Sequence, residues 1–299
     1  MKILVITGGN ASERKISLIS AKAVKKALEE NGHQVKLFDF RKGFHKLKKI
    51  IPDFDVIFPM LHGEEGEGGD LQKFLSKSSK PFVGGDWKGF KKGWYKISFK
   101  RFCENNKIPT APWKIIKTTR DIISFGFPSV LKASDGGSSK EVFILNSDKD
   151  LKNSAVKKLI SSNRPLFVES YIPGIDITAG ILDNDSLPLV EISLPKDKWF
   201  DYKNKYSGIS KETPNAPSLN PNTRILIRSI ASTIHNLLKL GQYSRIDFRV
   251  AFDKPYALEV NTIPGFTPTS SFPLAAKIAG LSFRKLVEKL VNSAIINKL

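Results

Sequence analysis

The sequence has a single cysteine, Cys103, among its 299 residues. One thiol excludes a disulfide framework and a cysteine-based metal cluster, and it suits a reducing compartment. Long apolar runs are missing too, because no stretch approaches the ~20 apolar residues that a membrane span needs. The apolar run within residues 1–9 is too short for a signal peptide. These absences predict a cytoplasmic protein that does not contact a membrane.

Acidic side chains are scarce relative to basic ones, with 29 Asp and Glu against 48 Lys and Arg, for a formal net charge of +19. Clustered lysines attract phosphate backbones, and residues 88–101 form the best candidate patch. The sequence lacks the zinc spacing, the RNP-like aromatic pair and the repeats that would support nucleic-acid binding. A solvated, lysine-rich surface is the simpler interpretation, so nucleic acid is not an expected partner.

Apolar segments in the first third alternate between strand-like and helix-like spacing. Hydrophobic residues make up 40% of the chain, which is ordinary for a globular protein. A helix is expected from Ser17, with Asn31-Gly32 as its end. The expected strands are residues 3–7, 35–38, 56–59 and 81–83. This alternation predicts a parallel α/β domain.

The rest of the chain predicts α+β structure. Its expected elements are strands at 129–132, 142–145 and 166–169, a helix opening at Asn220-Pro221, a hairpin from 245–252 and 256–261, and helices at 273–279 and 283–297. We therefore expect three domains, comprising residues 1–87, 88–178 and 179–299.

The clearest chemistry lies on the expected hairpin. Strand side chains alternate in direction, so Arg245 and Asp247 share a face, as do Glu259 and Asn261. With the turn at 253–255, Asp247 is expected roughly opposite Asn261. Carboxylate and amide oxygens, completed by nucleotide phosphates and water, suit Mg²⁺, which would orient a transferring phosphoryl group. A hairpin with polar residues on its solvated face is the alternative.

Other segments have the composition of anion-binding loops. Lys132 precedes the small residues 133–139, whose backbone N–H groups can approach phosphates, although this is not a P-loop and an ordinary flexible turn remains an alternative. The turn at 262–267 directly follows the acidic strand and offers N–H groups to a developing oxyanion. Glu169 and Asp176 bracket a segment suited to line a nucleotide pocket, or a turn with solvent-facing acids.

These strings, in this order, resemble the D-alanine–D-alanine ligase family of the ATP-grasp superfamily, through nearly the whole chain. The matching strings are Gly8-Gly9 with Ser12-Glu13-Arg14; Leu61-His62-Gly63 with Gly66-Glu67 and Gly69; Phe82-Val83-Gly84; Pro109 to Trp113; Lys132 with Gly137-Ser138-Ser139; Asp201-Tyr202 with Lys205-Tyr206; Arg245-Ile246-Asp247; and Glu259 to Gly265. The resemblance implies a three-domain ATP-grasp fold, α/β and α+β, with an N-terminal parallel α/β (pre-ATP-grasp) domain.

The resemblance also implies roles for individual residues. The implied metal ligands, for two Mg²⁺ or Mn²⁺ ions, are Asp247, Glu259 and Asn261. The implied ATP contacts are Lys96, Lys132, Ser139, Glu169, Asp176 and Lys205. The implied catalytic and substrate residues are Glu13, bonded to Ser138 and Tyr206, for the first ammonium; His62 for the first carboxylate; Arg245 and the Gly265 N–H for the oxyanion; Lys205 for loop closure; and Ser270 for the second carboxylate.

The implied reaction joins two D-alanines through an acylphosphate, with ATP converted to ADP and phosphate, and supplies a dipeptide for peptidoglycan precursors. Two alternatives stay open: a related ATP-grasp ligase with a different amino or hydroxy acid acceptor, and a non-catalytic nucleotide-binding homologue. Members of the family commonly dimerise, so the resemblance allows a homodimer, although no stretch establishes a self-complementary patch.

Several positions depart from the family pattern. Asp135-Gly136 stands where a basic-acidic pair is usual, and Lys140-Glu141 replaces a small Val-Gly pair after the two serines. Ser170 occupies the place of a lysine near adenine, and Asp176 is one methylene shorter than the usual glutamate. Ser271 replaces an apolar residue beside the second-substrate site. None of these changes removes an expected catalytic or metal-binding residue.

Overall fold

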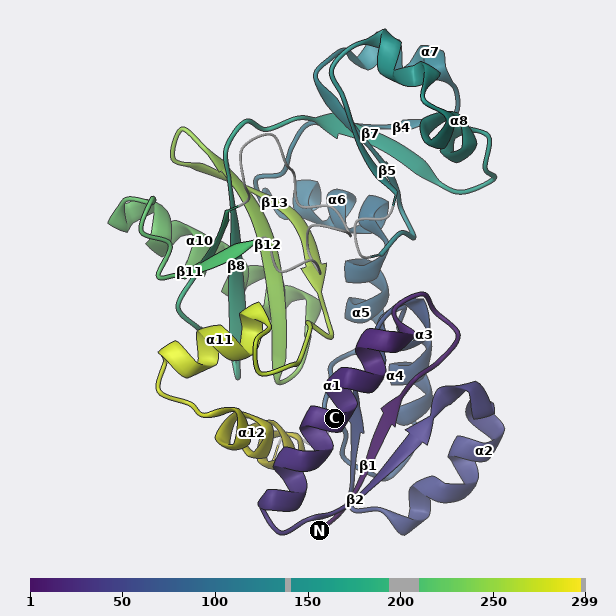
Figure 1. Ribbon diagram of the computed structural model, residues 1–299, viewed down its shortest axis with the longest axis vertical. Helices are drawn as coiled ribbons and strands as arrows, with labels where there is room; N and C mark the ends of the chain where they lie inside the picture. The colour runs from purple at the N-terminus through teal and green to yellow at the C-terminus, as the bar shows by residue number, and fades with distance from the viewer. Residues whose placement is uncertain (138–140, 194–209, 297–299) are drawn as a thin grey trace.

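The computed structural model describes residues 1–137, 141–193 and 210–296 (Figure 1). Its first part contains a three-stranded parallel sheet in the order β2-β1-β3, as the alternating pattern predicts. The elements of this part are β1 (Lys2–Thr7), α1 (Arg14–Glu30), β2 (Gln34–Asp39), η1 (Phe40–Lys42), α2 (Gly43–Ile50), η2 (Ile51–Asp53), β3 (Val56–Pro59), α3 (Glu64–Glu67) and α4 (Asp70–Leu75). Helix α1 ends at Glu30 with Asn31 as its C-cap, at the expected end, and begins at Arg14, before the expected Ser17.

The fourth strand expected at 81–83 is reduced to one parallel bridge, between Phe82 and Ile57 of β3. Pro81 has no N–H to donate to a ladder, and Gly84 turns the chain away at a φ of 149°. The chain then enters α5 (Trp87–Trp94) and α6 (Lys96–Asn105).

The central part is a four-stranded antiparallel sheet in the order β4-β7-β5-β6. It consists of β4 (Trp113–Ile116), α7 (Thr119–Phe125), β5 (Ser129–Ala133), β6 (Val142–Leu145), η3 (Asp148–Lys152), α8 (Ser154–Ile160) and β7 (Leu166–Ser170). The expected pairing of 129–132 with 142–145 is confirmed. This sheet and its helices enclose a hydrophobic core of their own, which includes Ile122, Leu131, Val156 and Val168.

The last part is a six-stranded antiparallel sheet in the order β11-β10-β8-β12-β13, with β9 beside β8. Its elements are β8 (Ile175–Leu182), β9 (Asp185–Ser186), β10 (Val190–Ser193), β11 (Lys211–Pro214), α10 (Pro221–Leu238), β12 (Tyr243–Ala251), β13 (Lys254–Asn261), α11 (Ser271–Ile278) and α12 (Phe283–Ile296). Helix α10 starts as expected, because the Asn220 side chain accepts a hydrogen bond from the Thr223 N–H at 2.8 Å.

The first and last parts of the chain share one hydrophobic core. Ile3 and Phe58 of the parallel sheet belong to the same buried cluster as Tyr243 and Phe266, and Figure 1 shows α12 alongside α1. Strand β8 continues across the expected boundary at 178/179. The division of the chain at 87/88 and 178/179 remains a proposal. Within the described ranges, no helix is long and apolar enough to cross a membrane.

The expected hairpin is present, but its register differs from the prediction. Arg245 lies opposite Asn261, and Asp247 lies opposite Glu259. The turn uses only residues 252–253, both at positive φ, and the register shifts at a bulge directly after Asp247. The expectation that Asp247 lies opposite Asn261 in the strand register is therefore wrong, although the two side chains are in contact. The acidic pair of the hairpin is instead a direct cross-strand pair.

Candidate active site

Two adjoining pockets meet over the β12–β13 hairpin. The first lies between the central sheet and the last sheet, and the second lies between the parallel α/β part and the last sheet. Both are lined by Lys96, Gly136, Gly137, Ile192 and Glu259. A molecule in one pocket therefore shares a wall with a molecule in the other.

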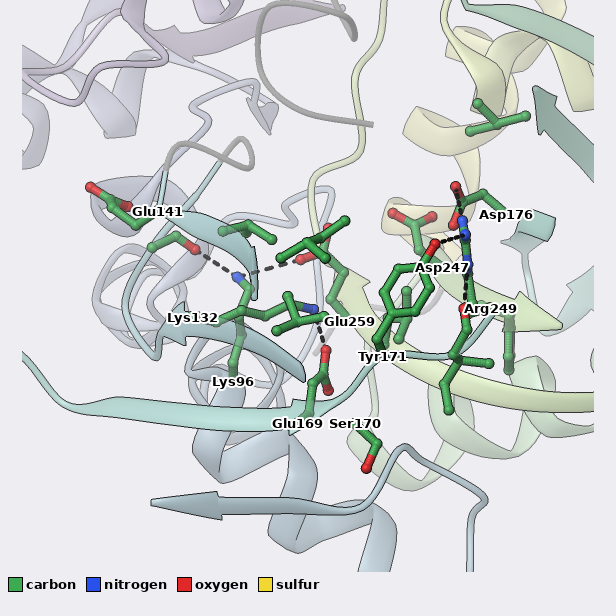
Figure 2. Close-up of a pocket in the computed structure, with 18 of the residues that line it drawn as sticks. Lys96, Lys132, Glu141, Glu169, Ser170, Tyr171, Asp176, Asp247, Arg249 and Glu259 are labelled. Atoms are coloured by element: carbon green, nitrogen blue, oxygen red, sulfur yellow. Dashed lines mark hydrogen bonds and ion pairs between the residues drawn. The ribbon is translucent and has the colours of Figure 1, made fainter. Parts of the chain in front are cut away.

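Three buried charged side chains form a cluster at the first pocket, and two of them, Lys132 and Glu169, line it. Glu169 on β7 forms ion pairs with both Lys132 and Lys100 (the Lys132 pair is drawn in Figure 2), and it is only 2% exposed. Burial raises the pKa of Glu169, but the two ammonium groups outweigh it and hold the pKa below its usual range. The carboxylate thus orients Lys132, and its expected contact with adenine stays a prediction.

Lys100 is a buried member of this group, although the sequence analysis placed it in the candidate basic patch at 88–101. Its side chain is fully buried in α6, and its Nζ donates to the Thr110 hydroxyl at 2.7 Å. Thr110 donates in turn to the Ala257 carbonyl of β13 at 2.7 Å. The available signal was a lysine at helical spacing among the apolar residues Phe99, Phe102 and Cys103. Lys100 connects the central sheet to the hairpin.

Asp176 lies at the other end of the first pocket. Arg249, which sequence reasoning did not single out, donates to its Oδ2 at 2.6 Å and to the Ile172 carbonyl at 3.0 Å (Figure 2). Burial raises the pKa of Asp176 and exceeds the opposing effect of Arg249. The arginine also lies over the Tyr171 ring, with its Cζ 5.8 Å from the centroid. The pocket wall at this end is a packed ionic and aromatic layer.

Lys96 stands where the two pockets join. Its Nζ donates to the Gly136 carbonyl at 2.6 Å and lies 3.4 Å from the Glu259 Oε2 (Figure 2). The ammonium therefore borders two segments. One is the glycine-containing loop after β5, of which Gly136 and Gly137 are described, and the other is strand β13, which carries Glu259. Such a point charge suits a phosphate placed at the junction.

The hairpin presents carboxylates and an amide to the same junction. Arg245 binds both oxygens of Asp247 at 2.8 Å, and Asn261 donates to the Asp247 Oδ2 at 2.9 Å. Burial lowers the pKa of Arg245, but Asp247, Glu259 and Glu212 outweigh it, so the guanidinium stays charged.

These oxygen donors fit Mg²⁺. Among the described residues, no group of three or more His, Cys, Asp and Glu side chains is arranged to hold a metal alone. Mg²⁺ does not require such a cage, because it commonly binds one or two carboxylates and completes its shell with water and substrate phosphates. Asp247 and Glu259, paired across the hairpin with Asn261 beside them, match that pattern.

Glu13 and the glycine-containing loop come together in the second pocket. Glu13 precedes α1 and accepts from the Ser12 hydroxyl at 2.9 Å. A Cβ on Gly137 would lie 2.8 Å from the Glu13 Oε1 and 3.2 Å from the Trp94 ring. A side chain at position 137 would therefore displace the Glu13 carboxylate from its present position.

The side chains of His62 and Glu67 contact the carbonyl and the N–H group of the same residue, Ile263. The His62 imidazole Nδ1 lies 2.9 Å from the Ile263 carbonyl oxygen, and the Ile263 N–H donates to the Glu67 Oε2 at 3.2 Å. The other Glu67 oxygen accepts from the Gly63 N–H at 3.1 Å. Burial raises the pKa of Glu67 to about 7, despite these hydrogen bonds. The role of Glu67 was not anticipated, although its string supports the resemblance.

The turn after the hairpin brings Gly265 and Ser270 together. A Cβ on Gly265 would lie 3.2 Å from the Ser270 Oγ, and that hydroxyl also accepts from the Thr267 N–H at 3.2 Å. Both residues line the second pocket, with Arg245. The neighbouring Ser271 donates to Glu212 at 2.9 Å, so the departure at this position forms a polar contact in the pocket wall.

The structure thus brings together the described residues that the sequence predicted for the site. Lys96, Lys132, Glu169, Asp176, Asp247 and Glu259 line the first pocket. Glu13, His62, Arg245, Asn261, Gly265 and Ser270 line the second. Ser138, Ser139, Lys205 and Tyr206 lie outside the described residues.

Known proteins are similar to this chain over nearly its full length. Residues 102–292 match the family model described as D-ala D-ala ligase C-terminus. A D-alanine–D-alanine ligase of Aquifex aeolicus is 37% identical over 296 residues, covering 97% of this chain and 100% of that protein. One from Maridesulfovibrio salexigens is 34% identical over 295 residues, covering 97% of each chain.

Solved structures of D-alanine–D-alanine ligases are also similar to this chain. The crystal structure of the Bacillus anthracis D-alanine–D-alanine ligase has a TM-score of 0.87 at 27% identity and covers 99% of this chain and 98% of its own. The complex of that enzyme with ATP has a TM-score of 0.85 at 25% identity with the same coverage. The fold expected from the sequence is confirmed. The chain belongs to the D-alanine–D-alanine ligase family.

Proposed function

We propose that this chain is an ATP-dependent ligase that joins two D-alanines, with ATP converted to ADP and phosphate. The observation that carries the proposal is the wall shared by the two pockets, formed by Lys96, Gly136, Gly137 and Glu259 among others. A nucleotide in the first pocket would end where an amino acid in the second begins. The relatives' names and the ATP complex of a similar enzyme support both substrates.

In the nucleotide pocket, Lys132 and Lys96 would contact the ATP phosphates. The ion pair with Glu169 aims the Lys132 ammonium, and the bond to the Gly136 carbonyl places Lys96. Glu169 and Asp176 would face adenine and ribose. Arg249 and Lys100 support these two carboxylates from behind.

Asp247, Glu259 and Asn261 would hold two Mg²⁺ or Mn²⁺ ions together with the phosphates. When bound, the metal neutralises phosphate charge and orients the transferring group. Arg245 keeps both Asp247 oxygens in one orientation through paired N–H donors.

In the amino-acid pocket, Glu13 would hold the ammonium of the first D-alanine, and His62 would lie near its carboxylate. Arg245 and the Gly265 N–H would stabilise the oxyanion, and Ser270 would hold the second carboxylate. A carboxylate facing an ammonium is an ordinary charge-assisted pairing. Gly137 allows the loop to lie against Glu13 because it has no side chain.

The reaction would take two steps. An oxygen of the first D-alanine carboxylate attacks the γ-phosphorus of ATP, which forms an acylphosphate and releases ADP. The amine of the second D-alanine then attacks the acyl carbon, loses a proton and expels phosphate. The developing charge falls on the carbonyl oxygen, where preorganised donors are most effective.

Four further residues belong to the proposal on the resemblance alone. Ser138 and Tyr206 would bond to Glu13, Ser139 would contact ATP, and Lys205 would close over the γ-phosphate and exclude water from the acylphosphate. The family also supports a cytoplasmic enzyme of peptidoglycan precursor synthesis, and a homodimer, which light scattering of the purified protein would test.

Phosphate release from the purified protein against a panel of D-amino acids and D-lactate tests the proposal. Release that requires D-alanine, with the dipeptide identified by mass spectrometry, is the expected result. Release with another acceptor only would favour the related-ligase alternative. Phosphate release that ignores every acceptor, or no release at all, would contradict a ligase.

A further inference from the structure

The two departures that flank the glycine-containing loop are joined by one arginine. Asp135 precedes the loop, Glu141 follows it, and Arg164 lies in the segment before β7. The Arg164 Nε and Nη2 reach the Asp135 Oδ1 at 3.0 and 2.8 Å, and Nη1 reaches the Glu141 Oε1 at 2.8 Å. One guanidinium therefore binds a carboxylate on each side of the glycine-containing loop.

Main-chain bonds tie the same parts together. The Ser134 N–H donates to the Pro165 carbonyl at 2.8 Å, directly beside Arg164. The other Glu141 oxygen packs against Gly136, where a Cβ would lie 2.8 Å from it. The Gly136 carbonyl in turn accepts from Lys96. The base of the loop is thus held by the arginine on one side and Lys96 on the other.

The arginine also balances charge where ATP would bind. Glu141 lines the nucleotide pocket and lies at its edge in Figure 2. Asp135 and Glu141 together carry two negative charges that would repel phosphates, and Arg164 offsets one of them. A lone exposed ion pair stabilises little, but a forked guanidinium on two carboxylates adds geometry that lysine lacks. The three side chains are only 28–32% exposed.

We propose that Arg164 is a positioning residue for nucleotide binding: it bridges Asp135 and Glu141, ties together the chain on both sides of the glycine-containing loop, and offsets negative charge beside the phosphate site. The proposal rests on the proposed function, in which this loop borders ATP. Arg164 need not touch the nucleotide itself. It explains how the chain accommodates two acidic departures beside a phosphate site.

Binding of β,γ-imido-ATP with Mg²⁺ to the full chain, measured by calorimetry, tests the bridge. Arg164→Met should weaken binding about fivefold to tenfold, because the carboxylates lose their partner. Arg120→Met, at an exposed arginine of α7 in the same sheet unit, is the matched control and should stay within about twofold. A Kd for Arg164→Met within twofold of the wild type would overturn the proposal.

Arg164→Lys separates bridging from charge. Lysine keeps the charge but lacks the fork, so it should weaken binding by an intermediate factor of about two to four. A wild-type Kd with lysine would show that charge alone suffices and would contradict the bridge. If Arg164→Met does not fold, Arg164→Lys against Arg120→Lys gives the same comparison.

Kinetics distinguish this proposal from the proposed function. In Arg164→Met the KM for ATP should rise while the KM for D-alanine stays within about twofold, and an equal rise in both would indicate general loosening and contradict a positioning role. If the wild type binds the analogue but makes no dipeptide, the ligase proposal fails. The Arg164 dependence of binding is then judged by calorimetry alone.

Discussion

The nucleotide half of the cleft borders a sheet that has its own hydrophobic core, whereas the amino-acid half lies between two parts of the chain that share one core. Polar contacts reflect the difference. Charged side chains such as Lys100, Glu169 and Arg249 support the nucleotide half, while backbone groups of the turn at 262–265, held by His62 and Glu67, support the other. The two halves should therefore respond separately to substitution, except at their junction.

The largest effect is expected at the junction. Glu259→Gln removes a carboxylate charge from the wall that both pockets share, so turnover should fall by at least about a thousandfold, which corresponds to about 4 kcal/mol. Steady-state phosphate release at several Mg²⁺ concentrations measures it. Glu30→Gln, at an exposed carboxylate of α1, is the control. Activity retained in Glu259→Gln would remove the metal assignment.

The next effect concerns the link between the central sheet and the hairpin. Lys100→Met leaves Glu169 with one cation in a buried site, so the free energy of unfolding should fall by about 3 kcal/mol. The KM for ATP should rise, and the KM for D-alanine should change little, because Lys100 and its partners Glu169 and Thr110 do not line the amino-acid pocket. Urea unfolding and kinetics measure both, with the exposed Lys92→Met as control. Equal changes in both KM values would contradict the claim that the two halves of the cleft respond separately to substitution.

Glu67 gives the shared core a pH dependence. Its pKa is about 7 in the folded chain against 4.5 as the ordinary value, so the folded state holds a proton between these values that the unfolded state has lost. The stabilising contribution is complete below about pH 4.5, declines as pH rises to 7, and is absent above it. It amounts to about 3 kcal/mol.

Urea unfolding of the wild type and Glu67→Gln, from pH 4.5 to 8, checks this dependence. The difference in free energy of unfolding between the two proteins should change by about 3 kcal/mol across this pH range, since glutamine does not titrate there. The control Glu30→Gln should track the wild type. A constant difference between wild type and Glu67→Gln would show that Glu67 does not hold a proton near neutrality.

The smallest effect is expected in the acceptor pocket. Ser270→Ala removes a hydroxyl beside Gly265, so the KM for the second D-alanine should rise about tenfold, worth about 1.4 kcal/mol, with the KM for ATP unchanged. Initial rates over a wide D-alanine range separate the two amino-acid sites. Ser229→Ala, exposed on α10, is the control. A rise confined to ATP would place Ser270 in the other half.

Local sequence patterns predicted the elements well but not their long-range partners. The parallel sheet, the hairpin and the start of α10 follow from spacing and capping residues. The hairpin register did not, because the turn uses residues 252–253 instead of 253–255, and the bulge after Asp247 shifts the pairing again. The roles of Lys100 and Arg249 were also not predicted, since each depends on an ion pair with a residue distant in the sequence, Glu169 and Asp176 respectively.

The central claim is that a nucleotide phosphate and an amino-acid carboxylate meet at the junction. Transfer of a carboxylate oxygen to phosphate tests this claim most directly. D-Alanine labelled with ¹⁸O in both carboxylate oxygens would be converted with ATP, and the released phosphate analysed by mass spectrometry. Attack of the carboxylate on the γ-phosphorus predicts one ¹⁸O in each phosphate formed with a dipeptide. Dipeptide formation with unlabelled phosphate would contradict the account.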